Sequence, residues 1–401
     1  KIFTSLGYPN LDIRYVGGCV RNYILDIPVN EIDIATPNTP DEVIKRLDDN
    51  KIKYILIGQS HGNIKARIGS YAFDITSLRK DLSCDGRHAI VEYTNNWAED
   101  TKRRDFTFNA MSMNPNGKVF DYFEGKVDAK QGKVKFIGDA ANRIQEDFLR
   151  IIRFFRFSAL YGKQKIDESI LITCKEFSIY LKQVSGERIT TELIKILSAR
   201  NPVYVIGLMF RYEILNRMLR GSFKDIVFNR LFFIETKILN IPNKFISWQL
   251  RLACIFSKDQ FQRSRVLYLS NEDKKIISNI YNAALEICSI VESDNNKYFN
   301  RYLYKYGNGV LGVQGFLLAY AQGQDLFNTI WETRYNKLIN YKHIDFPIKA
   351  DELINMGFSE GKKLGAVLDC LESEWIKSGF SLSQKDLLKS SKCFEKIIPG
   401  L

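Results

Sequence analysis

The sequence is poor in the residues on which zinc sites depend. It contains 3 histidines and 7 cysteines in 401 residues. No two cysteines form a C-x-x-C pair and the histidines are few, so neither a zinc site nor a histidine-based metal site is expected. The cysteines are Cys19, Cys84, Cys174, Cys254, Cys288, Cys370 and Cys393. Because they are scattered, we expect all of them to be reduced and most to be buried.

Long apolar runs are also absent. A membrane-spanning helix needs about 20 consecutive apolar residues, and the sequence has no run approaching that length. The first residues show no secretion-signal pattern either. These absences predict a cytoplasmic protein without a membrane anchor. The length of 401 residues is too great for one compact core and predicts about two to four domains.

Positively charged residues outnumber negatively charged ones. The chain has 58 Lys and Arg residues against 46 Asp and Glu residues, a formal net charge of +12. This balance favours an acidic partner such as a nucleic acid, although net charge alone leaves a membrane surface open.

A strand, a glycine turn and a helix are predicted near the N-terminus. The short apolar strand ends at Val16, and Gly17 and Gly18 follow it. Glycines let a phosphate approach the backbone, and the free N–H groups at the start of the helix can bind it. Arg21 lies one turn into this helix, where it can reach the same anion. Taken alone, however, two adjacent glycines are usually only a turn.

Two acidic residues follow on the next predicted strand. Glu31 and Asp33 are two positions apart, so both side chains project from one face of a strand. Two carboxylates on one face repel each other unless a cation lies between them, and oxygen ligands suit Mg²⁺. The alternative is an ordinary solvated strand face. A third carboxylate, Asp74, lies on the second strand of a hairpin predicted over residues 62–76, where it is either functional or merely exposed.

Two further stretches combine charged and apolar residues at helical spacing. The first predicts an apolar helix through Phe106 and Met111 that places Asp105 and Asn109 on one face, with Arg104 before it. The second predicts one continuous helix over residues 146–157. Its polar residues recur every three positions and are Asp147, Arg150, Arg153 and Arg156. Glu146 can pair with Arg150 four residues later. Both stretches are equally compatible with salt-bridged surface helices.

The order of these motifs resembles that of a known family. G-G-x-V-R followed by (D/E)-x-D-x-A-T, then R-R-D-F-T-x-N-A-M, then E-D-x-x-R, is similar to the class II tRNA nucleotidyltransferases and the related bacterial poly(A) polymerases. Both belong to the polymerase-beta-like nucleotidyltransferases. The resemblance covers residues 15–193 with five motifs and is thin beyond them. One departure is that the family usually has Asp where this chain has Glu31, which changes the reach of that carboxylate toward a metal.

The resemblance implies a role for each candidate residue. Glu31 and Asp33 would hold two Mg²⁺ ions and, with Asp74, would be the catalytic carboxylates. The implied nucleotide-binding residues are Gly17, Gly18, Arg21, Arg104, Asp105, Asn109, Asp147, Arg150, Arg153 and Arg156. Among these, Arg104 would contact the triphosphate, Asp105 and Asn109 the ribose, and Arg153 and Arg156 phosphates. The fifth motif, residues 185–193, would have structural roles only.

The physical basis of base selection can be stated for Asp147 and Arg150. Cytosine and adenine both present an amine donor beside a ring-nitrogen acceptor, which a carboxylate and a guanidinium complement. Uracil and guanine present the reverse pattern, so donors would face donors. An Asp–Arg pair would therefore select C and A without a nucleic-acid template.

The implied fold is α+β, with a polymerase-beta-like catalytic head followed by helices only. We expect the head at residues 1–137, a helical neck at 138–205, a body at 206–300 and a tRNA-binding tail at 301–401. The polar segment from Leu78 to Trp97 is predicted to be a mobile loop. In the family, a flexible loop here is needed for the change to adding A, and its length argues against an enzyme that stops after CC.

The implied activity is the addition of C, C and A to the 3′ end of tRNA from CTP and ATP, with release of pyrophosphate. Alternatives are a bacterial poly(A) polymerase, an enzyme that adds only CC or only A, and a non-catalytic RNA-binding protein. Poly(A) polymerases tend to carry Gly-Arg-Arg-Phe after the third strand, whereas this chain has Gly58-Gln59-Ser60-His61-Gly62. The oligomeric state is left open.

Overall fold

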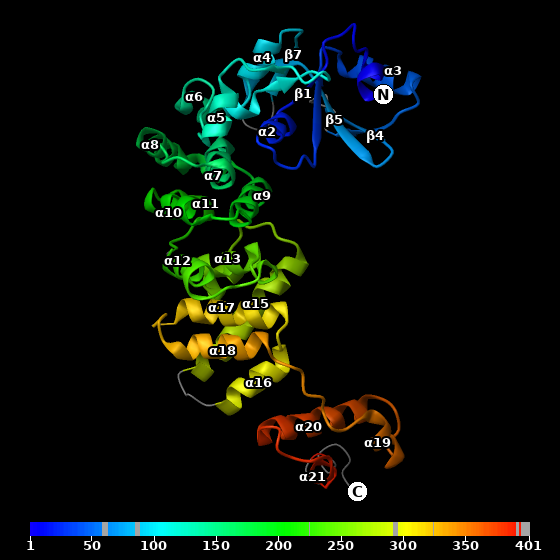
Figure 1. The fold of residues 1–401 in the computed structure, drawn as a ribbon, viewed down its shortest axis with the longest axis vertical. Coiled ribbons are helices and arrows are strands. Elements are labelled where there is room, and N and C mark those ends of the chain that lie inside the picture. Colours follow the sequence, from blue (N-terminus) through cyan, green and yellow to red (C-terminus); the bar gives the residue numbers. More distant parts are fainter. Residues whose placement is uncertain are drawn as a thin grey trace. The chain divides into compact units, whose positions relative to one another are not determined.

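The computed structural model divides into two compact units. It describes residues 1–57, 63–84, 89–223, 225–291, 296–323, 325–389 and 393. The first unit comprises Lys1–Lys224 with Ser264–Tyr268, and the second comprises Asp225–Arg263 with Leu269–Leu401. Strands occur only in the first unit within these described ranges, as the blue and cyan segments of Figure 1 show. This distribution is the α+β arrangement that the sequence predicts. The five residues 58–62, which carry the distinction from poly(A) polymerases, lie outside the described part.

A seven-stranded mixed sheet organises the head, in the order β3-β4-β5-β2-β1-β8-β9. Only the β2–β5 pair is parallel, and the other neighbours are antiparallel. The strands are β1 (Arg14–Val16), β2 (Ile32–Thr36), β3 (Lys53–Ile57), β4 (Asn63–Ile68), β5 (Tyr71–Ser77), β8 (Ser112–Met113) and β9 (Val119–Phe120). The hairpin predicted over residues 62–76 is confirmed over its described residues as β4–β5, with Asp74 on its second strand.

Side-chain alternation along β2 separates the apolar core from the acidic residues. Ile34 packs with α1 (Ile2–Leu6) and α3 (Pro40–Asp49) in the main core of the head. Asp33 and Ala35 point to the other face of the sheet, because strand residues alternate, and Ala35 packs there with Trp97 of α4 (Trp97–Lys102). The acidic strand face is thus kept apart from the face that the helices α1 and α3 cover.

The predicted loop from Leu78 to Trp97 is wrong. Its described residues form a two-stranded antiparallel sheet of β6 (Arg79–Cys84) and β7 (Ala89–Tyr93), with an irregularity between Asp81 and Ser83. Pairing the two segments satisfies their backbone groups, which a polar composition does not reveal. The β-branched and aromatic run ending at Tyr93 was the available strand signal.

Helices connect this head to the rest of the first unit. They are α2 (Gly18–Ile24), α5 (Gly125–Gln131), α6 (Ala140–Glu146), α7 (Leu149–Tyr161), α8 (Glu168–Phe177), α9 (Gly186–Leu197), α10 (Val203–Arg211) and α11 (Ile214–Leu219), with 3₁₀ turns η1 (Thr107–Asn109) and η2 (Ser178–Gln183). Two helix predictions are corrected. The apolar helix expected through Phe106 and Met111 is only the short turn η1, followed by β8.

The second correction concerns residues 146–157, which are not one helix. The chain leaves the helical conformation at Asp147 (φ −156°, ψ 108°), so α6 ends before it and α7 begins after it. The Asp147 carboxylate accepts a hydrogen bond from the Leu149 N–H at 3.1 Å, as Asp side chains do in turns. The break gives Asp147 a direction that a continuous helix would not.

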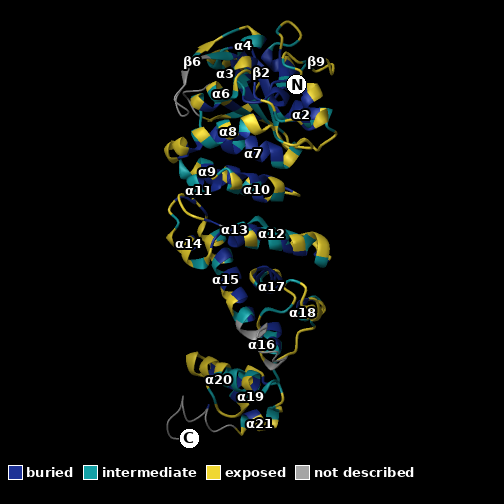
Figure 2. Cartoon of the chain, turned by 90° about the vertical axis from the view of Figure 1, so that its left-hand side faces the viewer, coloured by how far each residue is buried: buried dark blue, intermediate teal, exposed yellow. Residues whose placement is uncertain are grey.

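The second unit is all helical within its described residues, as predicted. Its elements are α12 (Ile226–Phe233), the π-helix η3 (Ile234–Ile238), η4 (Asn243–Phe245), α13 (Trp248–Ile255), α14 (Lys258–Arg263), α15 (Asn271–Val291), α16 (Asn296–Tyr306), α17 (Val310–Gln322), α18 (Thr329–Ile339), α19 (Ala350–Asn355), α20 (Lys362–Ser378) and α21 (Gln384–Leu388). Residues 312–321 of α17 are all buried (Figure 2). None of the described helices combines the length and the apolar character that a membrane crossing requires.

The expectation that every cysteine is reduced is wrong for one pair. Cys370 of α20 forms a disulfide with Cys393, and the two Cα atoms are 5.7 Å apart. They are 23 residues apart in sequence, and both contribute to the apolar cluster that α20 and α21 form. Cys19, Cys174 and Cys254 are free thiols, and all three are buried as expected.

Candidate active site

Twelve of the thirteen candidate residues line one cavity of about 570 Å³ in the first unit. They are Gly17, Gly18, Arg21, Glu31, Asp33, Arg104, Asp105, Asn109, Asp147, Arg150, Arg153 and Arg156. Asp74 is the exception. Residues that are 139 positions apart, from Gly17 to Arg156, thus meet around a space large enough for a nucleotide.

The glycine turn allows close packing at one end of the cavity. Gly17 has a φ of +72°, which disfavours residues with a side chain. A Cβ there would lie 3.3 Å from Nη1 of Arg104 and 3.8 Å from Oδ2 of Asp33. The turn therefore keeps a narrow space open between a guanidinium and a carboxylate.

Arg21 is a buried cation held by neutral acceptors. Its Nη1 donates to Oδ1 of Asn109 at 2.6 Å, and its Nη2 donates to the hydroxyl of Tyr161 at 2.8 Å and to Oδ1 of Asn22 at 2.9 Å. Its guanidinium also lies 4.2 Å from the centre of the Tyr161 ring. Burial lowers the pKa of Arg21 from its ordinary value. None of these hydrogen-bond partners neutralises the charge, so the residue is preset to bind an anion.

The acidic pair, Glu31 and Asp33, is electrostatically unsatisfied. Glu31 is exposed just before β2, and Asp33 is half-buried opposite Asp74 in the parallel β2–β5 register. Burial, with repulsion from Asp74 and Glu31, raises the pKa of Asp33 to about 6, although Arg104 opposes the shift. Among the described residues neither member of the pair makes an ion pair. A carboxylate in this condition is stabilised by a cation.

Asp74 does not complete a three-carboxylate site. Its carboxylate pairs with Lys65 at 3.2 Å. Within the described ranges no group of three or more His, Cys, Asp or Glu side chains could hold a metal ion. Mg²⁺ commonly uses one or two carboxylates, with substrate phosphates and water as its other ligands. The donor set of Glu31 and Asp33 fits that coordination, and a nucleotide in the cavity would supply the phosphates.

Arg104 is anchored from the side opposite the cavity. Its Nη2 lies 3.1 Å from Oδ2 of Asp100. The other oxygen of Asp100, Oδ1, lies 2.6 Å from Nη2 of Arg103. Burial alone would raise the pKa of Asp100, but the two arginines outweigh it and the pKa lies below its ordinary value. Asp100 thus stays ionised and orients Arg104, which retains donors for the cavity.

Asp105 and Asn109 lie close together although no helix joins them. The Asn109 amide donates to Oδ1 of Asp105 at 3.2 Å, and Arg153 donates to Oδ2 at 2.7 Å. The Phe106 N–H adds a third hydrogen bond to Asp105 at 2.9 Å. The expected proximity is therefore present, for a different reason: η1 turns the chain back, and the neck residue Arg153 fixes the carboxylate.

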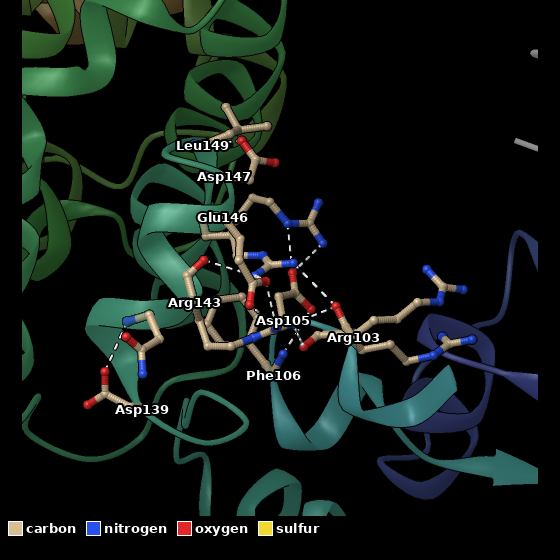
Figure 3. A network of polar contacts seen from close by, with 12 residues as sticks. Arg103, Asp105, Phe106, Asp139, Arg143, Glu146, Asp147 and Leu149 are labelled. Atoms are coloured by element: carbon tan, nitrogen blue, oxygen red, sulfur yellow. Dashed lines mark hydrogen bonds and ion pairs between the residues drawn. The ribbon is translucent and has the colours of Figure 1, made fainter. Parts of the chain in front are cut away.

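Glu146 and backbone carbonyls hold Arg150 in place. Figure 3 shows Arg143, Glu146 and Arg103, which belong to the same network of polar contacts. Arg150 donates to Glu146 at 2.5 Å, as predicted, and to the Arg103 carbonyl at 3.2 Å. Arg143 donates to both oxygens of Glu146, at 2.7 and 2.5 Å. It also donates to the carbonyls of Arg103 and Arg104, at 2.5 and 2.6 Å. Arg143 and Arg150 thereby join α6 and α7 to the segment that carries Arg104.

The remaining candidates of the neck, Asp147, Arg153 and Arg156, each form an ion pair with a residue far away in sequence. Asp147 binds Arg188 of α9 through Oδ2 at 2.6 Å. Arg156 binds Glu192 of α9 at 2.9 Å, and both side chains are more than nine-tenths buried. Arg153 and Arg156 are therefore engaged in ion pairs, in addition to lining the cavity.

Arg143, Tyr161 and Arg188 are among the residues of the site that the sequence analysis did not identify. Arg143 precedes Glu146 by three positions and Arg150 by seven, a helical spacing that could have indicated a shared face. Arg188 lies in the stretch that was expected to have structural roles only, yet it lines the cavity together with Lys195. No local signal pointed to Tyr161, which contacts Arg21 across 140 positions.

Comparison with known families gives two matches. Residues 13–135 match the family described as "Poly A polymerase head domain". Residues 165–224 match "Probable RNA and SrmB- binding site of polymerase A". The first match spans the sheet with the glycine turn and the acidic pair, and the second spans the helices α8 to α11.

Curated relatives and solved structures extend the similarity over the whole chain. The chain is 30% identical to the human "CCA tRNA nucleotidyltransferase 1, mitochondrial" over 393 residues, covering 96% of this chain and 87% of the relative. It is 28% identical to the "CCA-adding enzyme" of Ligilactobacillus salivarius, covering 96% and 93%. The crystal structure of the Bacillus stearothermophilus CCA-adding enzyme in complex with CTP superposes with a TM-score of 0.67 at 21% identity, covering 99% and 98%. The Thermotoga maritima enzyme complexed with tRNA gives 0.65 at 20% identity, covering 99% and 92%.

Proposed function

The chain belongs to the CCA-adding tRNA nucleotidyltransferases, and from this membership we propose how its own residues perform the reaction. Enzymes of this family add C, C and A to the 3′ end of tRNA from CTP and ATP. One observation carries the proposal for this chain. A single cavity contains an unsatisfied acidic pair, a glycine turn beside two arginines, and a carboxylate and guanidinium suited to a base.

Glu31 and Asp33 are the proposed ligands of two Mg²⁺ ions. When bound, these ions would lower the pKa of the tRNA 3′-hydroxyl and stabilise the charge of the pyrophosphate leaving group. The raised pKa of Asp33 supports this assignment, because the carboxylate is poorly stabilised without a cation. Asp74 acts from the adjacent strand by adding negative charge, rather than as a ligand.

The triphosphate is proposed to bind between Gly17, Gly18, Arg21 and Arg104. The narrow space at Gly17 admits phosphate oxygens, and Arg21 supplies a buried, preset charge. Arg104 is oriented by Asp100. With the nucleotide held in this way, the 3′-hydroxyl of tRNA attacks the α-phosphate and pyrophosphate leaves.

Asp147 and Arg150 form the proposed base-selecting pair. Asp147 would accept a hydrogen bond from the exocyclic amine, and Arg150 would donate to the neighbouring ring nitrogen. Their fixed positions support this role: the N–H of Leu149 and Arg188 hold Asp147, and Glu146 holds Arg150. Asp105 and Asn109 are proposed to recognise the ribose. Asn109 also accepts a hydrogen bond from Arg21 and so helps to hold that guanidinium in place. Arg153 and Arg156 add positive charge for phosphates.

The division of labour along the chain is proposed to follow four parts. Residues 1–137 form the catalytic head, 138–205 the neck with the base-selecting pair, 206–300 the body and 301–401 the tail that binds tRNA. The net charge of +12 supports binding of a polyanion over this length. We place the enzyme in the cytoplasm, because tRNA, CTP and ATP occur there together.

The activity test uses tRNA that lacks its 3′ end, incubated with labelled CTP and ATP. Addition of C, C and A in limited amount is expected. Long A tails would instead indicate a poly(A) polymerase. A partial enzyme would either stop after CC or add A only to tRNA that already ends in CC. No addition at all would indicate an RNA-binding protein. At saturating Mg²⁺, Glu31→Asp should keep or raise the rate, because Asp also ligates Mg²⁺, but the Mg²⁺ concentration that gives half the maximal rate should differ from that of the parent protein. If the rate is the same at every Mg²⁺ concentration, Glu31 is not a ligand.

A further inference from the structure

Asp147 and Arg150 do not hold each other in position. Arg150 donates to Glu146 and to backbone carbonyls. Asp147 has its two carboxylate oxygens on different partners: Oδ1 accepts from the Leu149 N–H at 3.1 Å, and Oδ2 accepts from Arg188 at 2.6 Å. The direction in which Asp147 presents its free lone pairs to the cavity is therefore set by Leu149 and Arg188.

Only one of these two partners is a side chain. The bond to the Leu149 N–H is local and follows from the start of α7. Arg188 reaches Asp147 from α9, 41 positions away. If Arg188 were removed, the Oδ1 contact would remain but the carboxylate could rotate about its own axis. Arg153 lies within electrostatic reach and would compete for it.

Arg188 itself stands on a well-fixed element. A Cβ on Gly186 would lie 2.3 Å from the Tyr268 ring, so the start of α9 packs directly against Tyr268, which belongs to the same unit. The Tyr268 N–H also donates to the Thr190 hydroxyl at 2.9 Å. A side chain on a helix anchored in this way can hold its partner within the tolerance that base recognition needs.

We propose that Arg188 is a positioning residue for nucleotide selection: it sets the direction of the Asp147 carboxylate, and through it the preference for C and A over U and G. The inference rests on the proposed base-selecting role of Asp147. It assigns a function to a stretch whose sequence suggested structural support alone.

A purely structural role accounts less well for the ion pair of Arg188 and Asp147. The Asp147 side chain is 17% exposed and that of Arg188 is 34% exposed. Partly exposed ion pairs contribute little to stability, about 0–1 kcal/mol. The buried pair of Arg156 and Glu192 already joins α7 to α9. Arg188 lies on the cavity wall with Asp147, where a change of direction affects the ligand more than the fold.

The test measures single-turnover kcat/KM for all four nucleotides on tRNA that lacks its end. Arg188→Ala is expected to raise the use of UTP and GTP relative to CTP and ATP by about tenfold, the effect of one misplaced hydrogen bond to a charged group. The selectivity of Arg188→Lys should lie between that of Arg188→Ala and that of the parent protein, because Lys keeps the charge but not the planar guanidinium with its fixed donors. Arg200→Ala is the matched control. It removes one exposed positive charge from the residues after α9 and should change all four values alike.

A double variant separates the inference from the proposal beneath it. If Arg188 acts through Asp147, then Arg188→Ala should change selectivity no further in an Asp147→Ala background. Additive effects on selectivity, or an Arg188→Lys protein with the parent's stability and unchanged selectivity, would overturn the inference. If Asp147→Ala alone leaves selectivity unchanged, the base-selecting role fails. A selectivity change in Asp147→Ala but not in the Arg188 variants would reject only the role of Arg188.

Discussion

The two ends of the cavity treat their carboxylates in opposite ways. At one end, Asp33 has like charges near it, no ion-pair partner among the described residues, and a pKa raised to about 6. At the other end, Asp147 binds Arg188 and Arg150 binds Glu146, so each charge is matched. Asp33, Asp147, Arg150 and Arg188 line the same cavity.

The difference follows from what each end is proposed to bind. A site for a divalent cation must keep negative charge uncompensated, which destabilises the fold until the cation arrives. A site for a neutral base gains nothing from excess charge, but it needs donors and acceptors in fixed directions. Unmatched charge and matched charge therefore indicate a metal end and a base end.

The largest expected effect is at the acidic end. Asp33→Ala should reduce nucleotide incorporation by at least about a thousandfold, because it removes a ligand of ions that stabilise the transition state. Binding of tRNA should hardly change, since it depends on basic surfaces. Filter binding and incorporation measured side by side test this. Equal losses of binding and incorporation would show that the acidic pair is structural.

At the base end, Asp147→Ala should change selectivity more than rate. The lost charged hydrogen bond is worth about 1.5–3 kcal/mol, or roughly ten- to a hundredfold. We expect measurable incorporation of UTP and GTP, with a smaller fall in overall rate than for Asp33→Ala. If only thermal stability falls and the enzyme still uses CTP and ATP alone, the two ends do not differ as described.

Between the two ends, Asn109→Ala should lower the preference for CTP over dCTP by about tenfold. A site that binds a hydroxyl rejects the analogue without it, because its polar groups would be left unpaired. The same change frees Arg21 from its 2.6 Å contact, so the KM for CTP should also rise. Single-turnover competition between CTP and dCTP measures the effect, and unchanged selectivity would remove Asn109 from the sugar site.

The smallest expected effect concerns stability. The folded-state pKa of Asp33, about 6, lies above the ordinary value of 3.8. Its contribution to stability is therefore fully present below about pH 4 and is lost as the pH rises through 6. In Mg²⁺-free buffer, Asp33→Asn should stabilise the protein at pH 7 to 8 by about 1 kcal/mol after allowance for solvent screening, and hardly at pH 4.

Thermal unfolding across this pH range measures the stability effect. Asp49→Asn, at an exposed position of α3, is the control and should show no such pH dependence. A stabilisation by Asp33→Asn that is equal at pH 4 and pH 7 would mean that the charge of Asp33 is not its cause.

Local signals sufficed for part of the head. The strand, glycine turn and helix around Gly17, and the hairpin that carries Asp74, formed as predicted. These features depend on side-chain alternation and on the backbone freedom of glycine, which short sequences encode.

Features that depend on tertiary contacts were not accessible in the same way. The hydrophobic period runs through Asp147 without interruption, yet the chain breaks there because its carboxylate caps Leu149 and binds Arg188. The pairing of β6 with β7 and the disulfide of Cys370 with Cys393 depend on register and packing. Sequence patterns identified twelve of the residues that line the cavity and the pairing of Glu146 with Arg150, but not the partners of Arg21, Asp147 and Arg156.

The most direct test of the contrast between the two ends is binding of Mn²⁺, as a probe for Mg²⁺, to the protein alone. Electron paramagnetic resonance can follow the free ion during titration of the parent protein, Asp33→Asn and Asp147→Asn at pH 7.5. Each variant removes one negative charge from the same cavity. The account predicts that Asp33→Asn loses the Mn²⁺ binding of the parent and that Asp147→Asn retains it. Equal losses in both variants, or retention in both, would contradict it.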